Sequence, residues 1–167
     1  DHLPDSVFIE DALLVFGDLA IVTSPGAESR RAETHGARET AKALRLRVVE
    51  LDLPATLDGG DVLVVGETVY VGASGRTNAE GIRQLRAILA PLGLAVVAVP
   101  VSKVLHLKSA VTALPDGTVV GQAKLVENPG LFERFLALPE AGASVVVLDA
   151  GTVLMAASTP KSAKLIE

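Results

Sequence analysis

The sequence contains no cysteine, which excludes disulfide bonds, thiolate zinc sites and a thiol nucleophile from these 167 residues. Basic residues are outnumbered, 15 against 20 acidic ones, and the net charge of -5 gives no electrostatic attraction to nucleic acid or to an anionic membrane surface. The longest apolar run, 92–101, is interrupted by a glycine and a proline and has about half the length that a bilayer span requires. We therefore expect neither a nucleic-acid partner nor a membrane-spanning helix.

The composition that remains is typical of a packed globular protein. Hydrophobic residues make up 49% of the chain and charged residues 21%, with 15 glycines. At roughly 150 residues per domain, 1–167 is predicted to form a single domain. The opening residues include neither a methionine nor the apolar segment of a signal peptide, so we expect the chain to begin partway through a longer product.

A pattern of strand, glycine-containing turn and strand occurs four times and predicts four β-hairpins. The turn glycines at 17, 66, 117 and 151 lie 49, 51 and 34 residues apart, which indicates an array of similar units. Helices are predicted over 30–44, 78–89 and 131–138, and additional strands over 46–51 and 94–100. The repeated unit is thus ββαβ, and the fourth copy is expected to stop after its hairpin. Such repeats bring their connecting segments together at one mouth, where polar residues can converge on a ligand.

Carboxylates occur at the same phase in the first two repeats. Asp5, Glu10 and Asp11 come before or at the start of the first hairpin, and Asp58 comes just before the second. In surface loops they would be ordinary turn residues. Because Glu10 and Asp11 abut a continuous apolar run, at least one should be partly buried and should need a cation or hydrogen-bond donors.

His106 occupies the equivalent phase in the third repeat, between two leucines. It is either a satisfied strand residue or, with Asp58 as an orienting carboxylate, a general acid and base whose pKa lies near neutrality. A metal site is disfavoured because no His-x-His or cysteine pattern is present.

Arg30 and Arg76 each close a hairpin and open a helix, where the helix dipole slightly disfavours a cation. Each is either a solvated surface side chain or a holder of an anion. Carboxylates for a cation together with arginines for a carboxylate describe a zwitterionic amino-acid ligand with a cationic side chain.

Four motifs, in this order and spacing, resemble the dimethylarginine dimethylaminohydrolase family of the guanidino-modifying (pentein) superfamily. They are Phe8-Ile9-Glu10-Asp11, Leu57-Asp58-Gly59-Gly60-Asp61-Val62, Gly75-Arg76-Thr77-Asn78 and Leu105-His106-Leu107-Lys108-Ser109. The resemblance implies an α/β propeller built from five ββαβ modules. This chain would hold the central modules, so that the propeller is incomplete, without the N-terminal lid segment and the C-terminal segment that carries the nucleophile.

The resemblance also implies roles for individual residues. His106 matches the catalytic histidine, and Asp58 matches a carboxylate that orients it and pairs with the substrate guanidinium. The remaining matches are substrate-binding positions: Asp11 and Glu10 at the guanidinium, Asp5 near the amino end, and Arg30 and Arg76 at the α-carboxylate. The implied reaction is hydrolysis of dimethylated or monomethylated arginine to citrulline and dimethylamine or methylamine, by way of a covalent thiouronium formed on a cysteine, with no metal or other cofactor.

The chain departs from the family pattern because it has no cysteine, and Ser109 matches no nucleophile of the family. Three readings therefore remain: a methylarginine hydrolase whose nucleophile lies outside these residues, an arginine deiminase-like hydrolase, and a catalytically silent methylarginine-binding module. The expected partner is the small-molecule substrate, a homodimer is left open, and a cytoplasmic location is inferred from the lack of a signal peptide and from the family's thiol chemistry.

Overall fold

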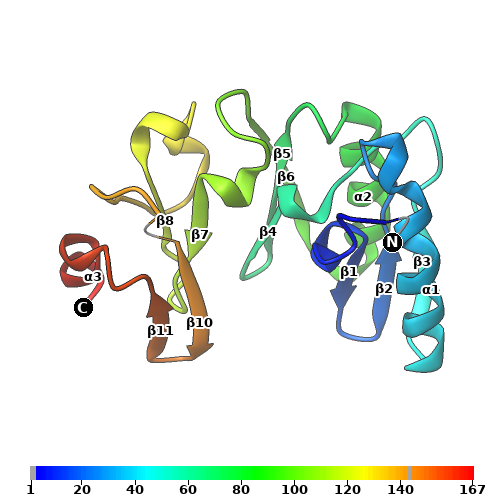
Figure 1. Ribbon diagram of the computed structural model, residues 1–167, viewed down its shortest axis with the longest axis horizontal. Helices are drawn as coiled ribbons and strands as arrows, with labels where there is room; N and C mark the ends of the chain where they lie inside the picture. Colours follow the sequence, from blue (N-terminus) through cyan, green and yellow to red (C-terminus); the bar gives the residue numbers. More distant parts are fainter. Residues whose placement is uncertain (1–2, 143) are drawn as a thin grey trace.

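The computed structural model describes residues 3–142 and 144–167; residues 1, 2 and 143 lie outside the described part. It contains four α/β units, called modules here, of residues 13–50, 62–100, 111–137 and 145–166. Figure 1 shows the modules side by side in chain order in an open row, with the two termini at different modules. The first three modules each have a three-stranded sheet and the fourth has two strands, so the predicted array of four hairpins is confirmed.

The first module shows the order that the others repeat. Strand β1 (Leu13–Phe16) pairs antiparallel with β2 (Leu19–Val22), and β3 (Arg47–Glu50) pairs parallel with β2 after helix α1 (Thr34–Ala43). The hairpin turn uses Gly17 at φ +60°, a left-handed conformation that glycine adopts without strain. Helix α1 begins later than the sequence predicts, because 28–33 form a 3₁₀ helix before it.

The second module is the most regular. Strands β4 (Val62–Val65) and β5 (Thr68–Ala73) form the hairpin, and helix α2 (Ala79–Leu89) leads to the parallel strand β6 (Ala95–Pro100). Asn78 caps α2 by accepting a hydrogen bond from the Gly81 amide at 2.8 Å. The predicted helix and strand are both present within a residue or two of their expected ends.

The third module corrects one prediction. Strands β7 (Val111–Ala113), β8 (Val119–Gly121) and β9 (Phe135–Ala137) repeat the sheet order, but the helix expected over 131–138 is wrong. Residues 129–131 form a 3₁₀ turn, and 135–137 are instead the strand β9, which hydrogen-bonds to β8 as its parallel partner.

The fourth module corrects a second prediction, that this copy ends after its hairpin. Strands β10 (Val145–Asp149) and β11 (Thr152–Met155) are followed by helix α3 (Pro160–Ile166). Pro160 stands at the first position of α3, where its missing N–H is not needed for helix hydrogen bonding.

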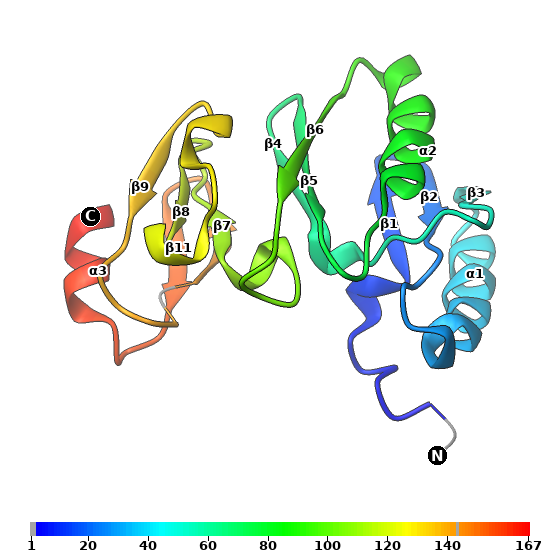
Figure 2. The same cartoon turned by 90° about the horizontal axis from the view of Figure 1, so that it is seen from above.

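The core lies in layers between neighbouring modules rather than inside any one of them. Figure 2 shows α2 between the first and second sheets, and its Ile82, Leu85 and Leu89 join one buried cluster with residues of β1, β2, β4 and β5. A second cluster joins the second and third modules, where the ring of Phe132 packs edge-on against Tyr70. Full burial of a leucine such as Leu85 contributes roughly 1.5–3 kcal/mol. These layers fix the modules against each other and thereby position the loops at their edges.

No helix in the described ranges has both the length and the apolar character needed to cross a bilayer.

Candidate active site

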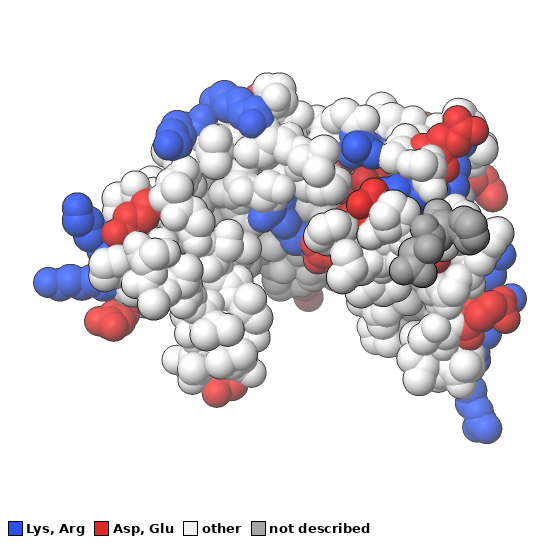
Figure 3. Space-filling view, in the orientation of Figure 1, with Lys and Arg blue, Asp and Glu red and all other residues white. Residues whose placement is uncertain are grey.

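A cavity of about 430 Å³ opens where the first three modules meet. Its lining includes every residue that the sequence singled out as a site candidate: Asp5, Glu10, Asp11, Arg30, Asp58, Arg76 and His106. Phe8, Ala27, Ser29, Leu105 and Ser109 complete the wall. Acidic and basic side chains lie next to one another over the first and second modules in the space-filling view (Figure 3). The structure thus brings together residues that lie up to 101 positions apart, between Asp5 and His106.

Arg30 forms the centre of a closed ion-pair network in the wall from the first module. Its Nη1 donates to Asp11 Oδ2 at 2.7 Å, and its Nε and Nη2 donate to Glu33 Oε2 at 3.1 and 2.8 Å. Nη2 also donates to the carbonyl oxygens of Asp5 and Phe8. The hydrogen bonds that Arg30 donates to Glu33, aided by the one to Asp11, raise the pKa of Arg30 above its already high ordinary value against the opposing effect of burial. This guanidinium therefore carries a permanent charge that neutralises two buried carboxylates.

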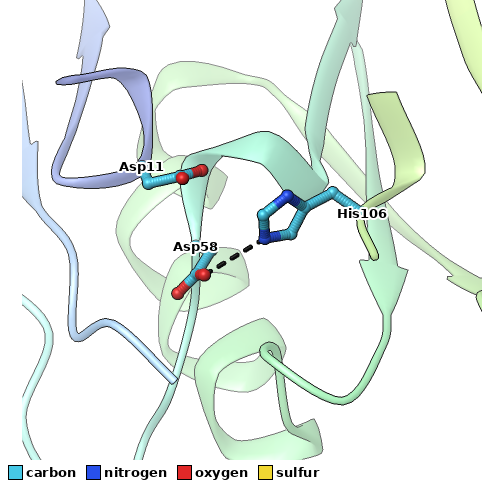
Figure 4. A group of neighbouring side chains, drawn as sticks. All are labelled: Asp11, Asp58 and His106. Carbon is cyan, nitrogen blue, oxygen red and sulfur yellow. Dashed lines mark hydrogen bonds and ion pairs between the residues drawn. The ribbon is translucent and has the colours of Figure 1, made fainter. Parts of the chain in front are cut away.

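Asp58 and His106 form a second pair, contributed by the second and third modules (Figure 4). His106 Nε2 lies 3.1 Å from Asp58 Oδ2, while Asp58 Oδ1 accepts the Gly26 amide at 2.8 Å. The hydrogen bond to Asp58, aided by the charges of Asp11 and Asp61, raises the pKa of His106 against the opposing effect of burial. A raised pKa favours the imidazolium near neutrality, which is the form that can give a proton to a leaving group.

The two glycines of the 57–62 motif are required by close approaches at the site. A Cβ on Gly60 would lie 2.8 Å from both Asp11 Oδ1 and His106 Nδ1, and a Cβ on Gly59 would collide with the backbone of Glu10. The Gly60 amide instead donates to Asp11 Oδ1 at 2.7 Å. These glycines therefore let the segments that carry Asp11 and His106 approach the 57–62 motif closely.

Asp61 is a structural residue of the site that the sequence analysis did not single out. It is fully buried, and its Oδ2 accepts hydroxyl hydrogen bonds from Ser74 and Thr77 at 2.6 and 2.7 Å. Its Oδ1 accepts the amide of Leu107 at 2.9 Å, which anchors the backbone beside His106. Burial raises the pKa of Asp61, and these hydrogen bonds oppose that rise. The sequence signal that could have identified Asp61 was its position in the same motif as Asp58.

The remaining candidates lie nearer to the mouth of the cavity. Asp5 and Glu10 are exposed, and Glu10 Oε2 accepts from Lys108 Nζ at 2.7 Å. Lys108 belongs to one of the four motifs but was not predicted to be a site residue. The Arg76 backbone amide bonds to the Ser74 hydroxyl, while its guanidinium has no hydrogen bond or ion pair with any residue in the described part of the chain.

Asp11, Asp58 and His106 each offer one potential metal-ligand atom, and these atoms lie within 4.8 Å of one another. Their oxygens already accept hydrogen bonds from Arg30, Gly60 and Gly26. Each carboxylate keeps acceptor capacity beside these bonds, so the group can also bind a ligand that donates hydrogen bonds, such as a guanidinium.

Comparison with known proteins adds an independent finding. The family model described as arginine deiminase matches residues 28–158. An N(G),N(G)-dimethylarginine dimethylaminohydrolase of Streptomyces coelicolor is 61% identical over 99% of this chain and 65% of its own length. A protein of the same name from Pseudomonas aeruginosa is 43% identical over 77% of this chain and 51% of its own length.

Solved structures agree with these matches. The Pseudomonas aeruginosa enzyme, in a variant with one cysteine replaced by serine and in complex with citrulline, superposes with a TM-score of 0.88 at 37% identity, covering 99% of this chain and 66% of that one. A dimethylarginine dimethylaminohydrolase adduct with 4-chloro-2-hydroxymethylpyridine superposes with a TM-score of 0.86 at 37% identity, covering 99% of this chain and 68% of that one.

These matches, with the repeated modules, define the class as the pentein superfamily, and the predicted incomplete α/β propeller is confirmed as the fold class. Within that class, the chain belongs to the dimethylarginine dimethylaminohydrolase family. It spans about two thirds of the length of its Streptomyces coelicolor relative.

Proposed function

We propose that this chain provides the substrate-binding pocket and the general acid and base for hydrolysis of dimethyl- or monomethylarginine to citrulline and an alkylamine. The observation that carries the proposal is the single cavity that collects all seven predicted site residues. The names of the curated relatives and the citrulline complex of the Pseudomonas aeruginosa protein support the same substrate class.

In this proposal the carboxylates bind the guanidinium of the substrate. Asp11 and Asp58 face each other across the cavity beside His106, and Glu10 lies next to Asp11 at the mouth. Bidentate hydrogen bonds from a guanidinium to such carboxylates hold its central carbon in a fixed position for attack. Asp5 would receive the substrate's ammonium at the exposed end of the cavity.

The two arginines would bind the α-carboxylate at the other end of the ligand. The guanidinium of Arg76 lines the cavity and can accept a carboxylate without breaking an existing bond to a described residue. Arg30 can contribute Nη2 if its bonds to the carbonyl oxygens of Asp5 and Phe8 are exchanged. Charge-assisted hydrogen bonds of this kind are worth about 1.5–3 kcal/mol each.

The chemical step proposed here uses a thiolate from outside residues 1–167, because the chain itself has no cysteine. The thiolate attacks the guanidinium carbon, and the carbon–nitrogen bond to the methylated nitrogen breaks as His106 gives that nitrogen a proton. A water molecule then loses a proton to His106, attacks the thiouronium carbon and releases citrulline and the thiolate. Asp58 holds the imidazole in place through both half-reactions.

The first test is the intact mass of the purified polypeptide, set against the 17.2 kDa of these residues, together with calorimetric titration with N(G),N(G)-dimethylarginine. For catalysis, the chain is joined to the flanking segments of the Streptomyces coelicolor relative and citrulline is measured. His106→Ala in this chimera should lower turnover by roughly 10²–10⁴-fold while the dissociation constant changes little. The exposed His35, replaced by Ala, is the matched control. Unchanged turnover in His106→Ala would remove the assigned role.

Two alternatives are separated by the same assays. An arginine deiminase-like enzyme would turn over arginine faster than dimethylarginine. A silent binding module would bind methylarginine saturably and produce no citrulline even in the chimera.

We also propose a cytoplasmic location, which suits a thiolate nucleophile, and leave open a homodimer, which analytical ultracentrifugation would detect.

A further inference from the structure

A second, smaller cavity of about 140 Å³ lies in the first module. Polar side chains dominate its lining: Thr23, Ser24, Arg31, Thr34, Arg38 and Glu50. It lies beside the carboxyl ends of the parallel strands β2 and β3 and beside the first residue of α1. No lining residue is shared with the candidate active site.

Two arginines that line this cavity each have a hydrogen-bond donor without a partner. Arg31 Nε and Arg38 Nε are both buried, and neither has a hydrogen-bond partner among the described residues. A buried N–H donor without a partner costs about 1–3 kcal/mol, and the penalty is larger for a charged group. The spacing of Arg31, Thr34 and Arg38 places all three on one side of the continuous helical stretch 28–43, so both arginine side chains line the same cavity.

One carboxylate is already present. Glu50 Oε2 pairs with Arg38 Nη2, whereas Arg31 has no ion pair with any residue in the described ranges. Two guanidinium charges against one carboxylate leave an excess of one positive charge at the cavity. A ligand that balances this excess would therefore carry a negative charge.

We propose that this cavity is a binding site for a phosphate-type oxyanion, held by Arg31 and Arg38 with the hydroxyl of Ser24 available to donate. A tetrahedral oxyanion offers acceptors in several directions at once, which matches two guanidinium groups and a hydroxyl that line the cavity from different elements.

The site would share a segment of backbone with the substrate pocket. Arg30 faces that pocket while the neighbouring Arg31 faces the oxyanion cavity. Ser24 is bridged to Leu57, and Gly26 donates to Asp58. An oxyanion would thus be bound against the segment that supports Asp58, although the proposal does not depend on any activity of the chain.

The test is thermal unfolding of the 167-residue chain at constant ionic strength and neutral pH, with inorganic phosphate replacing chloride. We expect the melting temperature to rise by roughly 3 °C at tens of millimolar phosphate. The rise should disappear in Arg31→Gln, which removes no bond to a described residue, and should shrink in Arg38→Gln. Because phosphate also stabilises proteins non-specifically, each variant is compared with its own value in chloride.

Two arginine variants control for other sites. Arg83→Gln removes an exposed arginine of α2, and Arg76→Gln removes the accessible cation of the substrate pocket. Both should keep the phosphate-dependent rise. A rise that is absent in the unmodified chain, equal in Arg31→Gln, or lost in Arg76→Gln would overturn the proposal.

A second readout is independent of folding stability. Phosphate titration followed by amide NMR should shift the Arg31 and Thr34 signals saturably, and unmoved signals would refute the site. Glycerol 3-phosphate in a parallel titration separates the two sources of the same chemistry: tighter binding than phosphate assigns the site to phosphate monoesters, and weaker binding assigns it to the free ion.

Discussion

Arg30 and Arg76 line the same cavity but stand in opposite settings. Arg30 is 7% exposed and donates to two carboxylates and two backbone carbonyls. Arg76 is partly exposed, and its guanidinium is unpaired within the described part of the chain. The same residue type at the same phase of two repeats therefore does two jobs: one arginine holds the wall of the cavity together, and the other is available to a ligand.

Neighbouring carboxylates cause the difference. Arg30 has Glu33 three positions later on the same helical stretch and meets Asp11 across the module. The Arg76 stretch has Asp61 nearby, but that carboxylate is occupied by Ser74, Thr77 and the Leu107 amide. Local pairing, rather than the arginine itself, decides which guanidinium remains accessible.

The largest effect should come from Arg30→Ala. This change leaves Asp11 and Glu33 buried without their counter-charge, and breaking a buried pair in this way typically costs about 3–5 kcal/mol of folding free energy. Urea unfolding measures the loss. Arg83→Ala removes the exposed pair with Glu80 and should leave the free energy of unfolding nearly unchanged. Similar losses of folding free energy in Arg30→Ala and Arg83→Ala would contradict the structural role assigned to Arg30.

Arg76→Ala should act on binding instead of folding. Loss of a charge-assisted contact to the substrate carboxylate should raise the dissociation constant for N(G),N(G)-dimethylarginine by about 10–100-fold. The free energy of unfolding should stay within about 0.5 kcal/mol of the unmodified chain, because no described partner is left unpaired. Calorimetric titration and urea unfolding of the same sample separate the two effects. An unchanged dissociation constant would take Arg76 out of the site.

The sequence predicted the parts of the fold that depend on local pattern. Turn glycines such as Gly17 and Gly66 marked the hairpins, and apolar spacing at Ile82 and Leu85 marked α2. The helix predicted in the third module is wrong because its segment around Phe132 has helical spacing but forms a turn and a strand, and the strand pairs with β8. A preference read from one segment cannot reveal that a neighbouring strand needs a partner.

The seven candidate residues line one cavity, and their roles stay predictions, whereas the pairing between their side chains was not predicted. Motif order placed Asp58 and His106 together, and they lie in one cavity. The pairing of Arg30 with Glu33 and of Lys108 with Glu10 depends on how the modules pack, which four motifs in register do not encode. The assigned role of Arg30 at a substrate carboxylate stays a prediction, and its donors are already engaged in this structure.

The smallest effect concerns His106, whose charge, unlike that of Arg30, depends on pH. Its bond to Asp58 raises the pKa of the folded state above the ordinary value of about 6.5. The stability that protonated His106 adds is therefore fully present below about pH 6.5 and is lost as the pH rises through the raised pKa. We expect the unmodified chain to lose at most about 1 kcal/mol relative to His106→Gln across this window.

Proton NMR of the imidazole signals gives the direct measurement. The His106 titration midpoint should lie above the ordinary value of about 6.5 and should fall toward it in Asp58→Asn, because the neutral amide removes the largest cause of the rise. A midpoint at or below the ordinary value in the unmodified chain would contradict the prediction. Since Arg30 keeps its charge over the whole pH range, its ion pair with Asp11 should persist while the His106 partner of Asp58 loses its charge. The binding of a cationic guanidinium should accordingly strengthen as His106 loses its proton.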